Sequence, residues 1–410
     1  MASLAGKVFF HDRLAGILEK TGPYQTTFQY NPGYLASQSP KIAHSLPLQK
    51  EPYVCTEGLH PFFDNLVAEG WLERAQTRLI GRQNVSRFEL LLSFGRDCAG
   101  AVSVVDDHPS TLIEDLSARL EKKEIASLRS RASLSGVQAK LAIVQDRAQY
   151  RVATEEELST DIAKFSAPEH ADLIFNEYLT TLALKELLPQ LAVADLHIGE
   201  VQGIDEPVLL IKRFDRGPNR QRIHFEEINQ IFQKYSSQKY FGNYEDISQF
   251  ILSEPHMLTT DNYKIFCQII ASILLSNTDL HLKNFAFFHT NLGLRLTPAY
   301  DNVSAALYGY NRMALGMSGA ENLRIETLRP KNIIALCRSF SLSLDLLEHI
   351  QAQMNLNKAA SQEAIRNAPY GSPSLKENLI KTMEQRWTTI FASIGKVLLH
   401  KPKLDENKNV

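Results

Sequence analysis

A run of polar residues interrupts an otherwise apolar region in the second half of the chain. SNTDLHLKNFAF (276–287) follows a helical, largely apolar pattern, YKIFCQIIASILL (263–275), and leads into FAFFHT, which is predicted to be a short buried strand. The run holds an acid, a histidine, a base and an amide: Asp279, His281, Lys283 and Asn284. Burying unpaired polar groups is costly, so we expect these side chains to be paired or to serve a ligand.

The bulk composition is that of an ordinary globular protein. The 410 residues are 44% hydrophobic and 22% charged, and 44 basic against 46 acidic residues give a net charge of −2. This balance gives no global basic field for nucleic acid. The four cysteines form no CxxC pair and are predicted to be reduced core thiols: Cys55, Cys98, Cys267 and Cys337. With no apolar run of about 18 residues and no export signal, we expect a cytoplasmic protein without a membrane span.

The order of predicted elements favours an α+β fold with two lobes, a β-rich one followed by a helical one. Hairpin, helix and strand patterns fill the first part of the chain, strands alternate with a helix in the next, and residues 220–400 are mainly helical apart from FAFFHT and LRLTPAY. The predicted segments are an N-terminal subdomain over 1–105, a charged linker over 106–132, a small lobe over 133–215, a helical lobe over 216–400 and a disordered tail over 401–410.

The spacing of Asp279 and Asn284 is typical of one kind of catalytic loop. Protein kinases place an Asn five residues after the catalytic Asp, so that the Asp accepts a hydroxyl proton while the Asn oxygen binds a hard cation. His281 lies where a donor could reach the transferring phosphoryl group. The spacing alone is also compatible with a helix-end cap and a structural Asn.

A second acid follows one hairpin later. FAFFHTNLGLRLTPAYDN is predicted to be a β-hairpin that ends just before Asp301. Kinases deliver their second metal-binding Asp in the same way, so two carboxylates and an Asn would converge on one magnesium ion. The alternative is that Asp301 caps a turn.

Two further segments have the residue types that a nucleotide needs. SLSGVQAKLAIV (133–144) places serines and a glycine before a strand, where backbone N–H groups can approach phosphate, although a plain hairpin turn has the same composition. Lys164 lies in the strand DIAKFS and could bind phosphates and pair with Glu177 of the next helix. Otherwise Lys164 extends to solvent and Glu177 lies on an exposed helix face.

The strand LLIKRFDR ends the small lobe. Backbone groups near Lys212 and Phe214 would suit the edge of an adenine, and the alternative is a core strand with a solvated basic end.

Together these segments resemble the HipA family, the serine/threonine-kinase toxins of bacterial type II toxin–antitoxin systems. The resemblance rests on SLSGVQAKLAI, AKF, FNEYLTTLA, IKRFDR, NTDLHLKNFAF and LTPAYDNVS, in family order and spacing. It spans roughly residues 1–350, because FQYNPGYLA, SLPLQ and PFFDNLVAEG look like the family's N-terminal subdomain.

The resemblance implies roles for individual residues. Asp279 would be the catalytic base, Asn284 and Asp301 would hold Mg²⁺, and His281 would lie near the phosphates of ATP. Lys164 would bind the α- and β-phosphates. Three short sets complete the implied site: a phosphate loop of Ser135, Gly136, Val137, Gln138, Ala139 and Lys140, an adenine hinge of Lys212, Arg213 and Phe214, and autophosphorylation at Ser133 or Ser135.

The resemblance also implies a biological role. Family members phosphorylate aminoacyl-tRNA synthetases, stop translation and growth, and bind a helix-turn-helix antitoxin (HipB-like) that contacts operator DNA. Two positions of the implied nucleotide site differ from the family pattern. Lys212 replaces the acidic residue that is usual in the hinge, and Ala139 replaces the glutamate that is usual in the phosphate loop. The competing hypotheses are a small-molecule kinase on the same fold and a catalytically silent module that joins the antitoxin.

Overall fold

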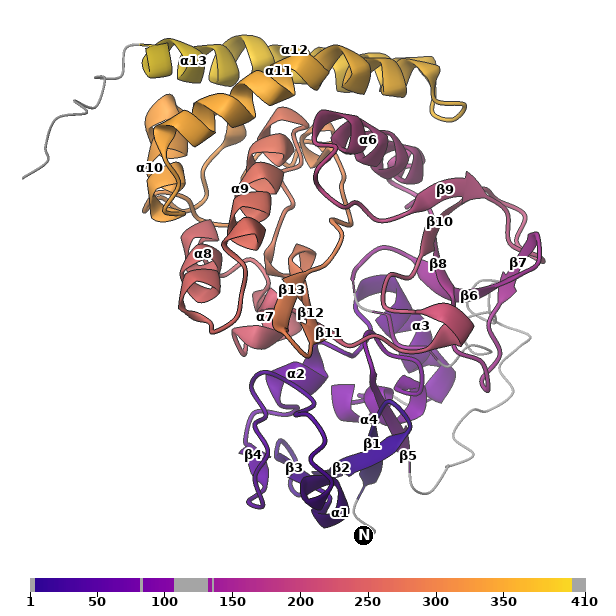
Figure 1. Cartoon of the computed structure of the whole chain (residues 1–410). Coiled ribbons are helices and arrows are strands. Elements are labelled where there is room, and N and C mark those ends of the chain that lie inside the picture. The colour runs from indigo at the N-terminus through magenta and orange to yellow at the C-terminus, as the bar shows by residue number, and fades with distance from the viewer. Residues whose placement is uncertain (1–3, 82–83, 107–131, 135, 400–410) are drawn as a thin grey trace, which may run out of the picture. The chain divides into compact units, whose positions relative to one another are not determined.

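The computed structural model describes residues 4–81, 84–106, 132–134 and 136–399, and its chain divides into two compact units (Figure 1). The first unit comprises Met1–Tyr178, Ala194–Lys239 and Leu282–Pro298, and the second comprises Leu179–Val193, Tyr240–His281 and Ala299–Val410. The predicted linker over 106–132 lies almost wholly outside the described residues, and the predicted tail lies wholly outside them. The proposed division into five segments stays a prediction.

The first unit begins with an antiparallel sheet of order β4-β3-β2-β1-β5. Its strands are β1 (Ala5–Phe10), β2 (Arg13–Lys20), β3 (Thr26–Tyr30), β4 (Tyr53–Cys55) and β5 (Val102–Asp106), and its helices are α1 (Pro32–Ala36), α2 (Pro61–Asp64), α3 (Gly70–Ile80) and α4 (Arg87–Phe94). Alternate residues of β1 are buried, as the predicted hairpin requires. Their core partners include Phe28, Phe63 and Leu91.

The sequence HPFFDNLVAEGWLERAQTRL has a helical pattern that predicts one helix, but it does not form a continuous one. The segment HPFFDNLVAEGWLERAQTRL forms α2 and α3 separately, because Gly70 has a φ of +58° that a continuing helix does not allow. A side chain at this position would also lie 2.6 Å from the Val137 carbonyl oxygen. Glycine at position 70 therefore brings the start of α3 against the segment before β6.

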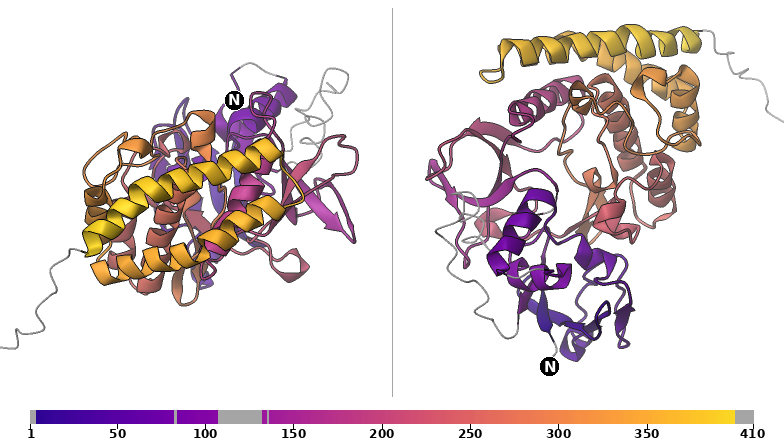
Figure 2. Two further views of the ribbon diagram at one scale, coloured as in Figure 1. Left: turned by 90° about the horizontal axis from the view of Figure 1, so that it is seen from above. Right: turned by 180° about the vertical axis from the view of Figure 1, so that it is seen from behind.

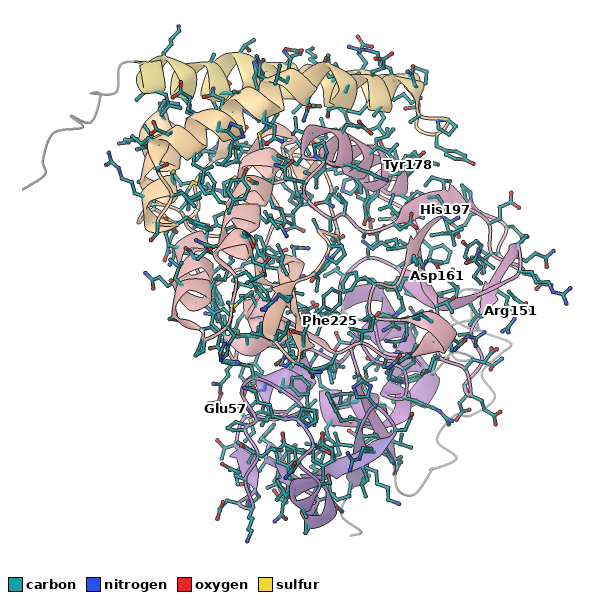
Figure 3. The ribbon with its side chains drawn as sticks, in the orientation of Figure 1. Glu57, Arg151, Asp161, Tyr178, His197 and Phe225 are labelled. Atoms are coloured by element: carbon teal, nitrogen blue, oxygen red, sulfur yellow. The ribbon has the colours of Figure 1, made fainter. Side chains whose placement is uncertain are left out.

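A second sheet of the first unit has the order β7-β6-β8-β10-β9. Its members are β6 (Lys140–Asp146), β7 (Gln149–Val152), β8 (Asp161–Lys164), β9 (Leu196–Gly199) and β10 (Val208–Lys212), and α6 (Leu173–Leu187) follows β8. Figure 3 labels one residue on each of β7, β8 and β9, namely Arg151, Asp161 and His197. Leu141, Ala163 and Leu210 of the inner strands form the core. These strands and this helix confirm the sequence-based prediction.

A third, smaller sheet completes the first unit. Its strands are β11 (Phe225–Glu227), β12 (Ala286–Thr290) and β13 (Gly293–Leu296), with α7 (Ile228–Ile231) and three 3₁₀ turns (Pro218–Arg220, Ser236–Gln238 and Leu282–Asn284) nearby. The β12–β13 hairpin was predicted, whereas β11 falls in a region predicted to be helical. Three residues are too few for an alternation pattern, so β11 was not detectable.

The second unit is helical. It holds α8 (Tyr244–Ser253), α9 (Thr259–Leu274), α10 (Pro330–Ser339), α11 (Leu344–Asn367), α12 (Pro373–Arg386) and α13 (Ala392–Leu399), with 3₁₀ turns at Ala305–Tyr308 and Ile325–Thr327 and a π-helical segment at Trp387–Phe391. Figure 2 shows α11 beside α12. The side chains of Lys358 and Gln362 on α11 contact Glu384 on α12.

None of the helices in the described ranges is long and apolar enough to cross a membrane. The four cysteines are free, and three are buried as predicted, whereas Cys55 is half-buried. Burial raises the pKa of Cys267 to about 12, which keeps that thiol protonated and unreactive.

A buried charge network ties the first sheet to the chain that follows β10. The Asp97 carboxylate lies close to three guanidinium groups, at 2.6 Å from Arg216, 3.4 Å from Arg213 and 3.8 Å from Arg222. A second carboxylate, that of Asp215, pairs with Arg213 at 2.6 Å. Burial opposes the ionisation of Asp97, but the three guanidinium groups outweigh it and hold its pKa well below the ordinary range. These charges are stable in the interior only as a set.

Replacing Asp97 with asparagine leaves several buried guanidinium groups without a counter-charge. We expect Asp97→Asn to lower the free energy of unfolding by about 3–5 kcal/mol. Urea denaturation followed by circular dichroism measures this loss. The control is Asp146→Asn, at a carboxylate whose side chain is 63% exposed, and a loss at position 97 no larger than the control's contradicts the structural role.

Candidate active site

The first part of the candidate site is a buried ion pair on the second sheet. The Nζ atom of Lys164, at the end of β8, lies 2.7 and 2.9 Å from the two carboxylate oxygens of Glu177 on α6. Their side chains are 9% and 0% exposed. The predicted pairing of these residues is confirmed, and the alternative of a solvated lysine and an exposed glutamate is wrong.

A second lysine lies beside this pair. Lys140 begins β6 and is the cross-strand partner of Lys164, so both side chains emerge on the same face of the sheet. Lys140 is buried, and its Nζ atom lies against Gly136. Two lysines on the same face of neighbouring strands provide positive charge where the sequence predicts phosphate binding.

The predicted phosphate loop has a conformation that requires its glycine. Gly136 has a φ of +101°, and a side chain there would lie 2.4 Å from the Lys140 Nζ atom. The Gln138 side chain donates a hydrogen bond of 2.8 Å to the Phe165 carbonyl, next to Lys164. Ala139 packs against the core of the second sheet, and Val137 is exposed. The loop is thus fastened to β8.

The two serines proposed for phosphorylation differ in what the structure describes. The Ser133 hydroxyl is buried and donates a hydrogen bond of 2.7 Å to the Leu66 carbonyl. Ser135 lies outside the described residues. In this conformation the Ser133 hydroxyl does not face solvent, so its modification requires the loop to leave the N-terminal subdomain.

The predicted adenine hinge has one side chain that is exposed to solvent and one that is buried and hydrogen-bonded. Lys212 is exposed, whereas Arg213 donates to Asp215 and to Ser159 within the buried network. The Lys212 and Arg213 backbone N–H groups donate to the Asp195 and Thr160 carbonyls. The Phe214 ring packs edge-on against neighbouring aromatic rings. The adenine hinge stays a prediction, and only other backbone groups of this segment are left to serve it.

Lys283, from the polar run that opened the sequence, is buried and paired. Its ammonium group contacts Glu69 and lies 3.5 Å from Glu227, and Lys239 lies 3.6 Å from Glu69. Burial opposes ionisation of Glu69, but Lys283 and Lys239 outweigh it and lower its pKa to about 2. Burial raises the pKa of Glu227, which shares Lys283 with the closer Glu69. An acid of the N-terminal subdomain thus holds a base of the predicted catalytic loop.

The proposed base, Asp279, lies in the second unit on the loop after α9. Its carboxylate is exposed and accepts a hydrogen bond of 3.0 Å from the Tyr240 hydroxyl. The Tyr240 ring meets the buried His281 ring edge-on at a centroid distance of 5.2 Å. Asp279 also lines a pocket of about 650 Å³ with Arg312 and Arg324. The Asp279 carboxylate is therefore open to groups that enter this pocket, and its role as a base stays a prediction.

The two proposed metal ligands lie on different segments. Asn284 ends the 3₁₀ turn before β12 in the first unit and is buried, and the chain crosses from the second unit to the first between His281 and Leu282. Asp301 comes after β13 in the chain and belongs to the second unit. Its backbone has a φ of +59°. A left-handed conformation at a non-glycine residue costs about 1–2 kcal/mol and is often found at functional sites. Convergence of Asp279, Asn284 and Asp301 on one ion stays a prediction.

Sequence reasoning missed Glu69, Tyr240 and the pocket arginines. Glu69 follows the helical pattern of α2 and lies far along the chain from Lys283, so no local spacing joins them. Tyr240 and Phe241 are exposed aromatic residues in the segment KYFGNYED. In the sequence, only this pair of aromatic residues before a glycine pointed to Tyr240 as a possible site residue.

Comparison with known proteins identifies the family. Residues 6–105 match the HipA N-terminal domain, and residues 132–368 match the HipA-like C-terminal domain. The chain therefore belongs to the HipA family, as the resemblance predicted.

Its relatives include proteins named as kinases. The chain is 28% identical over 359 residues to "Putative kinase Y4dM" of Sinorhizobium fredii, an alignment that covers 82% of each chain. It is 26% identical over 301 residues to the serine/threonine-protein kinase toxin HipA of Shewanella oneidensis, covering 65% of this chain and 68% of that one.

A solved structure defines the fold class. A chain of the Shewanella oneidensis complex of HipA, HipB and operator DNA aligns with 97% of this chain and 100% of its own length, with a TM-score of 0.77 and 20% identity. The predicted α+β, kinase-like fold is confirmed.

The charge on Glu69 makes a prediction about pH. Because its pKa in the folded chain is about 2, against 4.5 in the unfolded chain, Glu69 contributes stability above pH 4.5 that is lost as the pH falls toward 2. We expect Glu69→Gln to lower the free energy of unfolding by about 3 kcal/mol at pH 7, with the difference from wild type shrinking below pH 4.5.

Urea unfolding between pH 7 and pH 3 measures this difference. The matched control is Glu57→Gln at an exposed acid of the same subdomain, labelled in Figure 3. A constant difference across this range means that Glu69 does not act through its charge.

Proposed function

We propose that this chain is an ATP- and Mg²⁺-dependent serine/threonine protein kinase that acts as a toxin. The observation that carries the proposal is the buried Lys164–Glu177 pair, in which a strand lysine is held by a helix glutamate next to a glycine-containing loop. Active protein kinases use this arrangement to position a lysine on the nucleotide phosphates. Membership of the HipA family supports the same activity.

The donor set suits the metal that such a reaction needs. Asn284 offers an amide oxygen and Asp301 a carboxylate, and hard oxygen ligands of this kind are those that Mg²⁺ prefers. Bound Mg²⁺ would neutralise the negative charge that develops on the phosphates. The φ of +59° at Asp301 is consistent with a side chain held in place for a ligand.

The residues of the chain supply the remaining steps of the proposed reaction. Lys164 and Lys140 bind and orient the phosphates, and the backbone around Gly136 approaches them closely. Asp279 accepts the proton of the attacking hydroxyl, and the Tyr240 hydroxyl orients its carboxylate. His281 completes the environment of the phosphates. The Lys212–Phe214 segment receives the adenine.

The substrate is proposed to be a protein, an aminoacyl-tRNA synthetase by family analogy. The pocket beside Asp279 is open to solvent and combines arginine, asparagine and aromatic side chains, among them Arg312, Asn311 and Tyr310. Such a mixed lining suits a peptide segment that carries a serine. Phosphorylation of a synthetase would stop translation and growth.

The partner is proposed to be a HipB-like helix-turn-helix antitoxin. The solved HipA of similar fold comes from a complex with HipB and operator DNA. Because the net charge of this chain is −2, its own affinity for DNA should be modest. Operator binding would therefore occur through the antitoxin.

Self-regulation is proposed through the loop serines. A phosphate on Ser133 or Ser135 adds nearly two negative charges and would repel the phosphates of ATP. Since the Ser133 hydroxyl is buried against Leu66, the loop would first leave the N-terminal subdomain, and the added phosphate would then prevent its return.

The role of Asp279 gives the test of this function. We expect Asp279→Asn to lower phosphate transfer from ATP to proteins of a cell lysate by at least about 100-fold, because a general base typically contributes that factor or more. Radiolabel transfer measures the rate. Growth arrest on induction and added phosphate in the intact mass should be lost together with it.

The control is Glu377→Gln, at an exposed acid of α12. Label that appears only on small molecules would favour the small-molecule kinase. Growth arrest that persists in Asp279→Asn would favour a catalytically silent module.

A further inference from the structure

Three potential metal ligands gather on one face of the third sheet, in residues that the proposed kinase reaction does not use. His224 and Glu226 are two positions apart on the strand segment that contains β11, so their side chains point to the same face. His289 of β12 lies opposite His224, and its N–H donates to the His224 carbonyl at 3.0 Å. Figure 3 labels Phe225, the residue between His224 and Glu226.

The ligand atoms are close and mostly buried. One nitrogen or oxygen atom from each residue lies within 4.8 Å of the others, and the two imidazole rings are 4.6 Å apart between centroids. Glu226 is 0% exposed and His224 is 4% exposed. The His289 side chain is 18% exposed, which leaves a path from solvent.

Several polar atoms of this cluster are not satisfied. Among the described residues, the Oε1 atom of Glu226 is buried without a hydrogen-bond partner, and the Nε2 atom of His224 makes no well-aligned hydrogen bond, although its ring interacts with the Ile42 backbone. The Oε2 atom of Glu226 accepts from the His44 N–H at 2.6 Å and lies 2.7 Å from Nε2 of His289, without the alignment of a hydrogen bond. Buried groups of this kind are costly unless something binds them.

We propose that His224, Glu226 and His289 form a binding site for one divalent transition-metal ion, with zinc as the expected occupant. Two imidazoles and a carboxylate form a donor set that suits zinc, whereas Mg²⁺ prefers oxygen ligands alone. A tetrahedral ion would keep its fourth position for water. This site does not depend on the proposed kinase activity.

The geometry requires small adjustments on binding. The Nε2 atom of His289 and the Oε2 atom of Glu226 must separate from 2.7 Å, since ligands about 2 Å from a tetrahedral ion lie more than 3 Å apart. The neutral His224 ring must carry its proton on Nδ1, which gives up the long 3.3 Å contact from the Ala101 N–H. Binding then replaces the unsatisfied contacts with metal bonds.

The site joins two parts of the first unit. His44 and Ala101 belong to the N-terminal subdomain and contact the cluster through their backbone N–H groups, while the ligands come from β11 and β12. An ion there would fasten the subdomain to the hairpin that begins two residues after Asn284.

Zinc binding by the full-length chain tests the proposal. The protein is stripped with a chelator, dialysed and titrated with zinc sulfate against a chromophoric chelator. We expect one zinc ion per chain and a rise of several degrees in the thermal midpoint. Glu226→Gln and His289→Asn should each weaken binding at least 10-fold and lose the thermal shift.

The matched control, His256→Asn, alters a histidine in the second unit and should bind zinc like wild type. Cobalt binding by wild type gives a second readout, because visible absorption bands report a tetrahedral ion without any variant. The proposal is overturned if wild type binds no stoichiometric zinc, or if both cluster variants bind it as tightly as wild type.

Discussion

The contact between Glu69 and Lys283 is the interaction on which the arrangement of the first unit depends. Lys283 is buried in the loop between Asp279 and Asn284, and an ammonium group there is stable only with a counter-charge. The carboxylate comes from the N-terminal subdomain, more than two hundred residues earlier in the chain. The subdomain is therefore part of the structure that shapes the candidate active site.

Two other contacts also join the N-terminal subdomain to the rest of the first unit. The Trp71 N–H, next to Gly70, donates to the Val137 carbonyl, so the start of α3 also contacts the predicted phosphate loop. The buried Asp97 network fastens the end of the subdomain to the chain after β10. Because Glu69, Gly70 and Trp71 are consecutive, one short segment contacts both the loop with Lys283 and the loop with Gly136. A structural change in this segment of the subdomain would therefore affect both loops.

The sequence predicted the features that depend on local spacing or period. Alternation identified the β1–β2 hairpin, the strand pattern around Lys164 identified β8, and the helix pattern around Glu177 identified α6. The pairing of Lys164 with Glu177 was one of two alternatives, and the structure decided between them. The family resemblance then supplied roles for Asp279, Asn284 and Asp301 that spacing alone left open.

The remaining features depend on contacts between distant segments. The break between α2 and α3 arises from the backbone conformation of Gly70, which an amphipathic pattern does not reveal. Lys283 is paired with Glu69, which comes from the segment just before α3. The meeting of His224 with His289 depends on the pairing of β11 with β12, and β11 is too short to be detected. Burial of Ser133 likewise arises from a contact with Leu66 of another segment.

The central claim is that Lys164, held by Glu177, binds the phosphates of ATP. Calorimetric titration of a non-hydrolysable ATP analogue with Mg²⁺ into wild type and into the double variant Lys164→Met/Glu177→Leu tests it most directly. Removing both charges leaves no unpaired charge in the interior, so the fold should be retained. We predict Mg²⁺-dependent binding that is at least about 10-fold weaker in the double variant, a difference of about 1.4 kcal/mol. Equal affinity in the two proteins, or no binding to wild type, would contradict the account.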